Sequence, residues 1–280
     1  MSSNEISYLI LGHITQDVSP SEMHLGGTAS YSGLTACALE HSVRMVTAFP
    51  GKFPFSSIEN LSFHCVDTDN ATQYENIMLN GNRKQHCYSQ AAPITPNDIP
   101  AEWMKSDIIH IGPVAQEIPQ ETVDCFKGHP FLCATPQGWM RNWDKEGLVH
   151  PITWDWAEQV LPFLKAVVIS TEDIQGDEKI IAEMVRLSNI LVVTEAKDGA
   201  RVYWNGDVRY FSAPNVPMLD ATGAGDIFAA VYFSRLFSTG DAWQSAKAAV
   251  QLASRSVSKT GLQGIPTMQD IQSSMVEIMK

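Results

Sequence analysis

Asp220-Ala221-Thr222-Gly223-Ala224-Gly225-Asp226 runs directly into the apolar segment IFAAVYFSRL, residues 227–236. Two glycines one residue apart therefore stand at the start of a predicted helix. The first N–H groups of a helix have no partner within it, and the helix dipole adds positive charge at that end. Such a turn can bind an anion such as a phosphoryl group. Asp226 would either stabilise the helix start by its charge or accept a proton from a substrate hydroxyl beside the anion.

Outward from this turn, short apolar runs alternate with helical patterns along most of the chain. Seven runs are expected to form strands: Ser7–Leu11, Arg44–Ala48, Ser62–Val66, Ile108–Ile111, Phe131–Ala134, Ala166–Ile169 and Ile190–Thr194. Helical patterns lie between several of them, as over Gly27–Leu39 and Asp177–Leu187. The C-terminal third is expected to be helical over Ile227–Phe237 and Ala242–Ser258. The alternation predicts an α/β fold with a mostly parallel central sheet and helices on both faces.

One region interrupts the alternation. Thr72–Leu79 and Arg83–Tyr88 flank Asn80-Gly81-Asn82, and Asn-Gly between two extended runs is a strong hairpin signal because both residues tolerate positive φ. We interpret residues 70–90, approximately, as a small β lid inserted in a single domain of residues 1–280. The alternative is an ordinary surface hairpin.

Two further segments depart from the strand and helix patterns. Pro136–Pro151 contains two Gly, two Pro and two Trp, which predicts a long loop after the strand at Phe131–Ala134. Ligands bind outside the carboxyl ends of strands in open α/β sheets, and long loops there are often functional. Ala200–Trp204 and Val208–Phe211 surround Asn205-Gly206-Asp207 and predict a second hairpin.

The composition excludes several classes of function. The 280 residues are 44% hydrophobic and carry a net charge of −12, which argues against nucleic acid and anionic membranes as partners. The longest apolar run, Ile227–Phe233, is far shorter than the roughly 18 residues of a membrane span. We expect no signal peptide, because the N-terminus lacks a basic region. Five cysteines without a CxxC pair predict a reduced, cytoplasmic setting, with all five buried or half-buried.

The 220–226 stretch with its apolar helix closely resembles the C-terminal signature of the ribokinase-like (PfkB) family of carbohydrate and nucleoside kinases. Three other segments resemble family motifs in the same order. Ile10–Asp17 resembles the first strand, which ends in a substrate-binding Asp, and Gly26-Gly27 resembles the paired glycines before a helix. Val192–Thr194 through Lys197–Ala200 resembles the strand and turn that hold the nucleotide. The resemblance covers essentially the whole chain and implies the ribokinase-like fold.

The resemblance also implies roles for individual residues. Asp226 corresponds to the catalytic base, and the backbone of Gly223, Ala224 and Gly225 to the anion hole for the γ-phosphoryl group. ATP and Mg²⁺ are the implied cofactors, and a sugar, an inositol-like polyol or a nucleoside is the implied substrate. The remaining assignments are Asp17 and Gly27 for substrate, Ser170, Thr194, Gly199 and Thr222 for nucleotide, and Asp173 for the metal.

Three departures from the family pattern leave the donor geometry and the substrate open. Tyr31 stands where the helix after Gly26-Gly27 often has Asn. Ser170-Thr171-Glu172-Asp173 replaces Asn-x-x-Glu, and Thr194-Glu195-Ala196 replaces Thr-x-Gly. The Tyr31 variant and the lid pattern resemble the subgroup of inositol and nucleoside kinases. On that basis the substrate-side candidates are Arg83, Gln85, Gln137 and Arg141.

The sequence therefore predicts an ATP-dependent kinase that phosphorylates a hydroxyl, either a monomer or a homodimer. No GxxxxGK[ST] motif occurs, which excludes a P-loop enzyme by motif. The alternative is a catalytically silent sugar- or nucleoside-binding protein of the same fold. Retention of Asp226 beside its glycines argues against that alternative, because a pure binder needs no base there.

Overall fold

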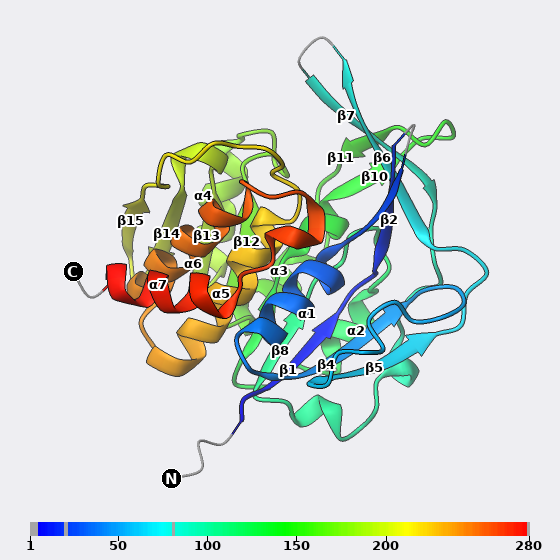
Figure 1. Ribbon diagram of the computed structural model, residues 1–280, viewed down its shortest axis with the longest axis horizontal. Coiled ribbons are helices and arrows are strands. Elements are labelled where there is room, and N and C mark those ends of the chain that lie inside the picture. The colour runs from blue at the N-terminus through cyan, green and yellow to red at the C-terminus, as the bar shows by residue number, and fades with distance from the viewer. Residues whose placement is uncertain (1–4, 20–21, 80–81, 279–280) are drawn as a thin grey trace.

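The structure is a computed structural model, and it describes residues 5–19, 22–79 and 82–278 (Figure 1). Its centre is a nine-stranded sheet of order β15-β14-β13-β12-β9-β8-β1-β4-β5. In that order the strands are Asp207–Phe211, Ala200–Trp204, Ile190–Thr194, Ala166–Ser170, Leu132–Ala134, Ile108–Ile111, Ser7–Leu11, Ser42–Ala48 and Leu61–Val66. All seven strands predicted from apolar runs are present, with ends that differ from the prediction by at most two residues.

The seven strands from β13 to β5 are mutually parallel, and β14 and β15 add an antiparallel edge. The predicted second hairpin is thus confirmed. The helices are α1 Thr28–Ala38, α2 Gln120–Asp124, α3 Ala157–Val160, α4 Glu178–Leu187, α5 Ala224–Thr239, α6 Ala242–Ser256 and α7 Met268–Ile278. Helix α7 was not among the elements predicted from the sequence.

Helices cover both faces of the sheet, as predicted. Along β1, Tyr8 and Ile10 belong to the core shared with α1, α5 and α6, whereas Leu9 and Leu11 belong to the core shared with α2, α3 and α4. This alternation follows from the two-residue period of a strand. The strands are apolar throughout because each is buried on both sides. Among the described residues, none of the helices has the length and apolar content that a membrane crossing requires.

The lid is larger than the predicted hairpin. Four strands form a separate sheet of order β3-β2-β6-β7, with bounds Met23–Gly26, Thr15–Val18, Thr72–Leu79 and Asn82–Ser89. Strand β2 is parallel to β6, so the lid joins two distant parts of the chain. Figure 1 shows the β6–β7 hairpin reaching beyond the main body. The turn residues 80 and 81 lie outside the described residues.

Buried polar contacts fasten the lid to the main sheet. The His13 ring is hydrogen-bonded through Nδ1 to the Thr72 hydroxyl at 2.7 Å, at the start of β6. The Tyr74 hydroxyl donates to the carbonyl of Val114 at 2.7 Å. The buried Glu117 carboxylate accepts the backbone N–H of His13 at 3.0 Å and that of Ala115 at 2.7 Å. The lid is therefore anchored at the loops that follow β1 and β8.

The predicted long loop Pro136–Pro151 is wrong in part. After the short 3-10 helix η3 (Pro136–Met140), strands β10 (Arg141–Trp143) and β11 (Val149–Pro151) form an antiparallel hairpin. Its turn is stabilised by Asp144, whose carboxylate accepts the N–H of Leu148 at 2.9 Å. Its strands pack Trp143 and Val149 against the lid residue Tyr74. The segment is thus an ordered support for the lid.

The remaining short helices are η1 Pro96–Asp98, η2 Trp103–Lys105, η4 Leu161–Phe163, η5 Ala196–Asp198 and η6 Gly261–Gly264. All five cysteines are free thiols. Four are buried or half-buried as expected, but Cys125 is exposed, so the expectation was wrong for that residue. Cys125 follows α2 directly, where a short helix leaves it outside the core.

Candidate functional site

The glycine turn has the conformation that its sequence predicts. Gly223 is the N-cap of α5 with φ 76° and ψ −2°, in the left-handed region that favours glycine. The N–H of Ala224 donates to the carbonyl of Ala221 at 3.2 Å. Among the described residues, no hydrogen-bond acceptor takes the N–H of Gly223 or Gly225. These two N–H groups, with the dipole of a sixteen-residue helix, are therefore available to bind an anion.

The first residue of the motif holds the turn in place. Asp220 accepts the N–H of Thr222 at 2.9 Å through one carboxylate oxygen and that of Gly261 at 2.8 Å through the other. The N–H groups of Leu219 and Asp220 both donate to the carbonyl of Val257. The turn is therefore clamped to the segment between α6 and η6. Thr222, predicted as a nucleotide contact, is half-buried within this clamp.

Tyr31 packs directly against the turn. A Cβ atom added to Gly223 would lie 2.2 Å from Cδ1 of the Tyr31 ring, so both φ and the neighbouring ring require glycine. At Gly225, nothing lies within 4 Å of an added Cβ, so that residue faces open space. Tyr31 is 2% exposed, and burial, followed by the charges of Asp17 and Asp220, raises the pKa of its hydroxyl well above the usual value.

Asp226 lies in the first turn of α5, half-buried against α1. The Thr28 hydroxyl donates to its carboxylate, and the Ser32 hydroxyl donates to its backbone carbonyl at 2.9 Å. Burial raises its pKa from 3.8 to about 6, and the charges of Asp173 and Asp17 act in the same direction. The Thr28 hydrogen bond and the charge of Arg141 oppose that shift. The carboxylate is thus ionised at neutral pH and has a pKa suited to accepting a proton.

Asp17, Asp173 and Arg141 lie close enough to Asp226 for their charges to act on its pKa. They come from β2, from the turn after β12 and from the start of β10. This convergence occurs at the carboxyl edge of the sheet, where open α/β folds bind ligands. Asp17 accepts the Thr15 hydroxyl at 3.1 Å, and a Cβ on Gly26 would lie 2.5 Å from Asp17 Oδ2. Gly26 therefore makes room for the Asp17 side chain.

Arg141 connects the lid to the edge of the sheet. Its guanidinium donates to the side-chain oxygen of Gln85 in β7 at 2.7 Å and to that of Gln137 in η3. It also lies over the ring of Tyr74, 5.1 Å from the ring centroid. Three of the four substrate-side candidates thus form one polar group. The fourth, Arg83, has a side chain that lies outside the described part of the structure.

Asp173 is held by two donors at the end of β12. Gln137 Nε2 donates to one carboxylate oxygen at 3.0 Å, and the N–H of Ser170 donates to the other at 2.8 Å. Burial raises the pKa of Asp173, while these two hydrogen bonds lower it. In the described residues, no three His, Cys, Asp or Glu side chains gather as a metal cage. A single carboxylate fits Mg²⁺, which takes most of its ligands from phosphate oxygens and water.

The other predicted nucleotide residues lie nearby, at or after the carboxyl ends of β12 and β13. The Thr194 hydroxyl donates to the carbonyl of Ile169 at 3.2 Å. Gly199 has φ 103°, and a Cβ there would lie 1.9 Å from the carbonyl oxygen of Phe211. The backbone conformation of this turn is therefore sufficient reason for a glycine at position 199. The same holds for Gly27, with φ 86° and a Cβ position 2.3 Å from the His13 carbonyl oxygen.

Thr28 was not predicted as a site residue from the sequence, and Tyr31 was given no structural role. Both follow Gly26-Gly27 on α1, and the contact of α1 with the start of α5 is what brings them to Asp226 and Gly223. In the sequence, only the Gly26-Gly27 pair before the helix indicated that this end of α1 contributes to the candidate site. The contact with α5 joins residues nearly two hundred positions apart, which local pattern does not reveal.

The fold and the site together form an α/β structure in which helix α5 begins at a glycine turn beside Asp226. Residues 166–268 match the family described as pfkB family carbohydrate kinase. An inositol 3-kinase of Zea mays is 27% identical over 146 residues, or 51% of this chain. A fructokinase of Klebsiella pneumoniae is 29% identical over 136 residues, or 43% of this chain. The matches span only 38% and 44% of the lengths of these curated relatives.

Solved structures extend the likeness to almost the whole chain. A pyrophosphate-dependent myo-inositol-1 kinase converted into a myo-inositol-3 kinase has a TM-score of 0.81 at 19% identity, covering 96% of this chain and 99% of that one. The ribokinase of Thermotoga maritima has a TM-score of 0.73 at 17% identity, covering 97% and 99%. These likenesses show the ribokinase-like fold. The chain is thus similar to pfkB carbohydrate kinases over residues 166–268 in sequence and over almost its whole length in fold.

Proposed function

We propose that this protein transfers the γ-phosphoryl group of ATP to a hydroxyl of a sugar, an inositol-like polyol or a nucleoside. The observation that carries the proposal is Asp226, whose pKa of about 6 and place beside the left-handed Gly223 turn combine a base with an anion site. A general base must be close to its operating pH and next to the reacting group. Asp226 meets the first condition by its pKa of about 6. It meets the second because it lies in the first turn of α5, next to the proposed anion site at Gly223.

In this mechanism Asp226 accepts the proton of the attacking hydroxyl. The N–H groups of Gly223 and Gly225, with the dipole of α5, stabilise the charge on the transferring group. Thr28 orients the Asp226 carboxylate by its hydrogen bond. Mg²⁺ bound with the nucleotide would neutralise phosphate charge, and Asp173 is the residue that would hold it.

The acceptor side supplies groups that suit hydroxyls. Asp17 offers a carboxylate, and Arg141 with Gln85 and Gln137 offers donors and acceptors under the lid. Hydroxyl groups both donate and accept hydrogen bonds, so a mixed lining fits a polyol. The names of the relatives, an inositol 3-kinase and a fructokinase, support this substrate class. A fructokinase structure of the same fold from Xylella fastidiosa contains ATP, which supports the donor.

The test is a panel of acceptors with MgATP. Myo-inositol, fructose, ribose and adenosine are each incubated with the protein, and ADP and phosphorylated product are measured. We expect transfer to at least one acceptor, and its loss in Asp226→Asn. Asp207→Asn, an exposed carboxylate on the β14–β15 hairpin, is the matched control that keeps full activity. Tight binding of an acceptor by calorimetry without product from ATP or pyrophosphate would instead establish the catalytically silent binding protein.

A further inference from the structure

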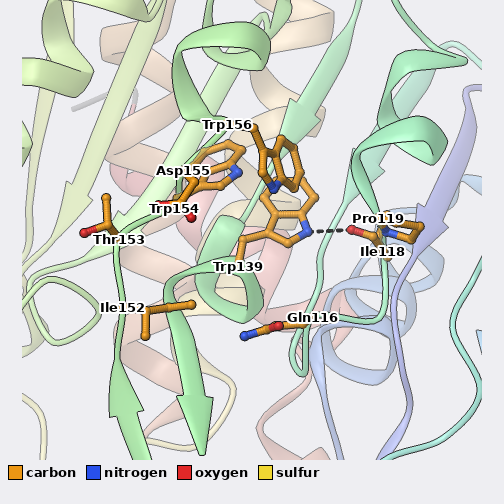
Figure 2. Close-up of a pocket in the computed structure, with 9 residues that line it drawn as sticks. All are labelled: Gln116, Ile118, Pro119, Trp139, Ile152, Thr153, Trp154, Asp155 and Trp156. Carbon is orange, nitrogen blue, oxygen red and sulfur yellow. Dashed lines mark hydrogen bonds between the residues drawn. The ribbon is translucent and has the colours of Figure 1, made fainter.

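A pocket lies on the face of the sheet opposite α1 and Asp226, and Figure 2 shows the residues that line it. Its volume is about 200 Å³, and Trp139, Trp154 and Trp156 form its apolar wall. The Trp139 ring centroid lies 4.7 Å from those of Trp154 and Trp156, and the planes of Trp139 and Trp154 are inclined by 28°. Trp139 and Trp154 belong to the core shared with α2, α3 and α4. The pocket is therefore distinct from the candidate active site.

The indole N–H of Trp139 has a hydrogen-bond partner, whereas that of Trp154 has none among the described residues. Trp139 donates to the carbonyl of Ile118 at 2.7 Å, as the dashed line in Figure 2 shows. The indole nitrogen of Trp154 is buried and has no hydrogen-bond partner among the described residues. A buried donor without a partner is destabilising. Because this nitrogen is enclosed by protein, the polar contacts open to a ligand are those of the pocket rim.

The rim of the pocket limits the chemistry of a ligand. Gln116, Thr153 and Asp155 contribute an amide, a hydroxyl and a carboxylate, and none of the nine lining residues is Lys or Arg. A negative rim without a cation disfavours phosphorylated sugars and nucleotides. Hydroxyl groups both donate and accept, so they match all three rim groups, and the C–H face of a ring packs well on indole. The volume suits a molecule of one ring.

The rim is also attached to the acceptor side of the candidate active site. Gln116 adopts φ 58°, an uncommon conformation for a residue other than glycine. Its side-chain N–H donates to the backbone carbonyl of Arg141 at 2.7 Å. The Arg141 guanidinium in turn binds Gln85 of the lid. A ligand that contacts Gln116 would thus act on the segment that positions Arg141.

We propose that this tryptophan pocket is a second binding site, for a neutral polyhydroxylated ring such as a sugar or a cyclitol. Occupation would stabilise the Gln116–Arg141 contact. The binding claim stands by itself, whereas any effect on phosphoryl transfer rests on the proposed function.

Calorimetry with myo-inositol and fructose tests the binding claim. Asp17→Ala disables the acceptor site, and we expect this variant to keep one binding event for at least one of the two probes. Adding Asp155→Ala should weaken that event by about tenfold or more, the effect of losing a hydrogen bond to a charged group. Glu158→Ala, an exposed carboxylate on α3 outside the lining, should leave it unchanged.

Three outcomes would overturn the binding claim. They are loss of all polyol binding in Asp17→Ala, equal binding with and without Asp155→Ala, and binding of tetramethylammonium in place of the polyols. Melting curves of each variant show that it is folded. Because the wild-type protein is assayed for transfer separately, failure of the second site and failure of the kinase proposal give different results.

Kinetics with the preferred acceptor test the link to Arg141. Gln116→Ala should raise the acceptor KM several-fold and leave kcat unchanged, because Arg141 positions substrate in our proposal. Gln120→Ala removes an exposed amide that contacts Gln159 and should change neither constant. An unchanged KM in Gln116→Ala would overturn the link.

Discussion

The glycine turn and the acceptor side of the candidate site are built in different ways. The turn is one continuous stretch whose geometry lies in its backbone, with Gly223 in the left-handed region and Asp220 clamping both sides. The acceptor side is assembled from side chains of β2, β7, η3 and β10. Backbone geometry is encoded locally, whereas the assembly depends on the whole fold. In the proposed function, the turn therefore sets the type of chemistry, and the acceptor side determines the substrate.

The largest expected effect is on the base itself. Asp226→Asn keeps the shape of the side chain and its contact with Thr28 but removes the proton acceptor. We expect kcat to fall by about 10²–10⁴, the range for loss of general-base assistance. Nucleotide affinity, measured by calorimetry, should persist because the turn is intact. Turnover close to that of the wild-type protein would remove Asp226 from the mechanism.

The two glycines of the turn should respond differently to alanine. Gly223→Ala meets both a positive φ and the Tyr31 ring, so we expect a loss of about 1–3 kcal/mol or more in the free energy of unfolding. Gly225→Ala faces open space within a helix, so its stability should be equal or slightly higher.

Transfer assays complete the comparison of the glycines. Gly225→Ala should lower transfer at least about tenfold despite normal folding, because its methyl group stands beside an anion-binding N–H. Denaturant unfolding and initial rates measure the two properties. Equal destabilisation by both substitutions would contradict the assigned geometry, and full activity of Gly225→Ala would exclude its N–H from the anion site.

On the acceptor side, Arg141 should affect binding more than chemistry. Arg141→Ala removes the contacts to Gln85 and Gln137, and we expect the acceptor KM to rise about tenfold, the effect of losing a charge-assisted hydrogen bond. Arg141→Lys should recover only part of the loss, because an ammonium lacks the planar fork. The control is Arg209→Ala, which removes an exposed arginine on β15. A change in kcat alone would place Arg141 in the chemical step instead.

The smallest expected effect is a pH-dependent change in stability. The pKa of Asp226 rises from 3.8 to about 6 in the folded protein, which therefore holds this proton more tightly than the unfolded chain does. The contribution of Asp226 to the free energy of unfolding is therefore present at low pH and is lost as the pH rises through 6. The cost at pH 7 is at most about 3 kcal/mol, from about two pH units at about 1.4 kcal/mol each.

Asp226→Asn removes that cost. The variant should melt at a higher temperature than the wild-type protein at pH 7, and the gain should shrink toward pH 4. Thermal melts of both proteins across this range measure it. A gain that does not change with pH would show that the Asp226 carboxylate is not destabilised by burial.

The sequence predicted the central sheet well because its strands are apolar on both faces, a pattern that needs no knowledge of neighbours. It missed β2 and β3, whose residues TQDV and MHLG have no alternation of their own. Strand β2 forms by pairing with β6, and β3 forms by pairing with β2. It also missed the hairpin β10–β11, which depends on the Asp144 turn and on packing of Trp143 against the lid. In each case the strands depend on long-range contacts, which a local sequence pattern does not show.

The candidate site also has a part that could be predicted from the local sequence and a part that could not. The glycine turn was chosen as the candidate site from seven consecutive residues. The charges of Asp17, Asp173 and Arg141 act on the pKa of Asp226, and the roles assigned to these residues stay predictions. The support of Gly223 by Tyr31 was not predictable, because it requires the packing of α1 on α5. The nucleotide roles of Thr194, Gly199 and Thr222 remain predictions.

The pH dependence of kcat/KM for phosphoryl transfer, measured from pH 5 to 8 with the preferred acceptor, tests the role of Asp226 most directly. The wild-type rate should rise with pH through an apparent pKa of about 6 and then level off, as the Asp226 carboxylate becomes ionised. Asp226→Asn should show a low rate without this rise. A wild-type rate that is independent of pH over this range, or the same rise in Asp226→Asn, would contradict a mechanism in which Asp226 accepts the proton.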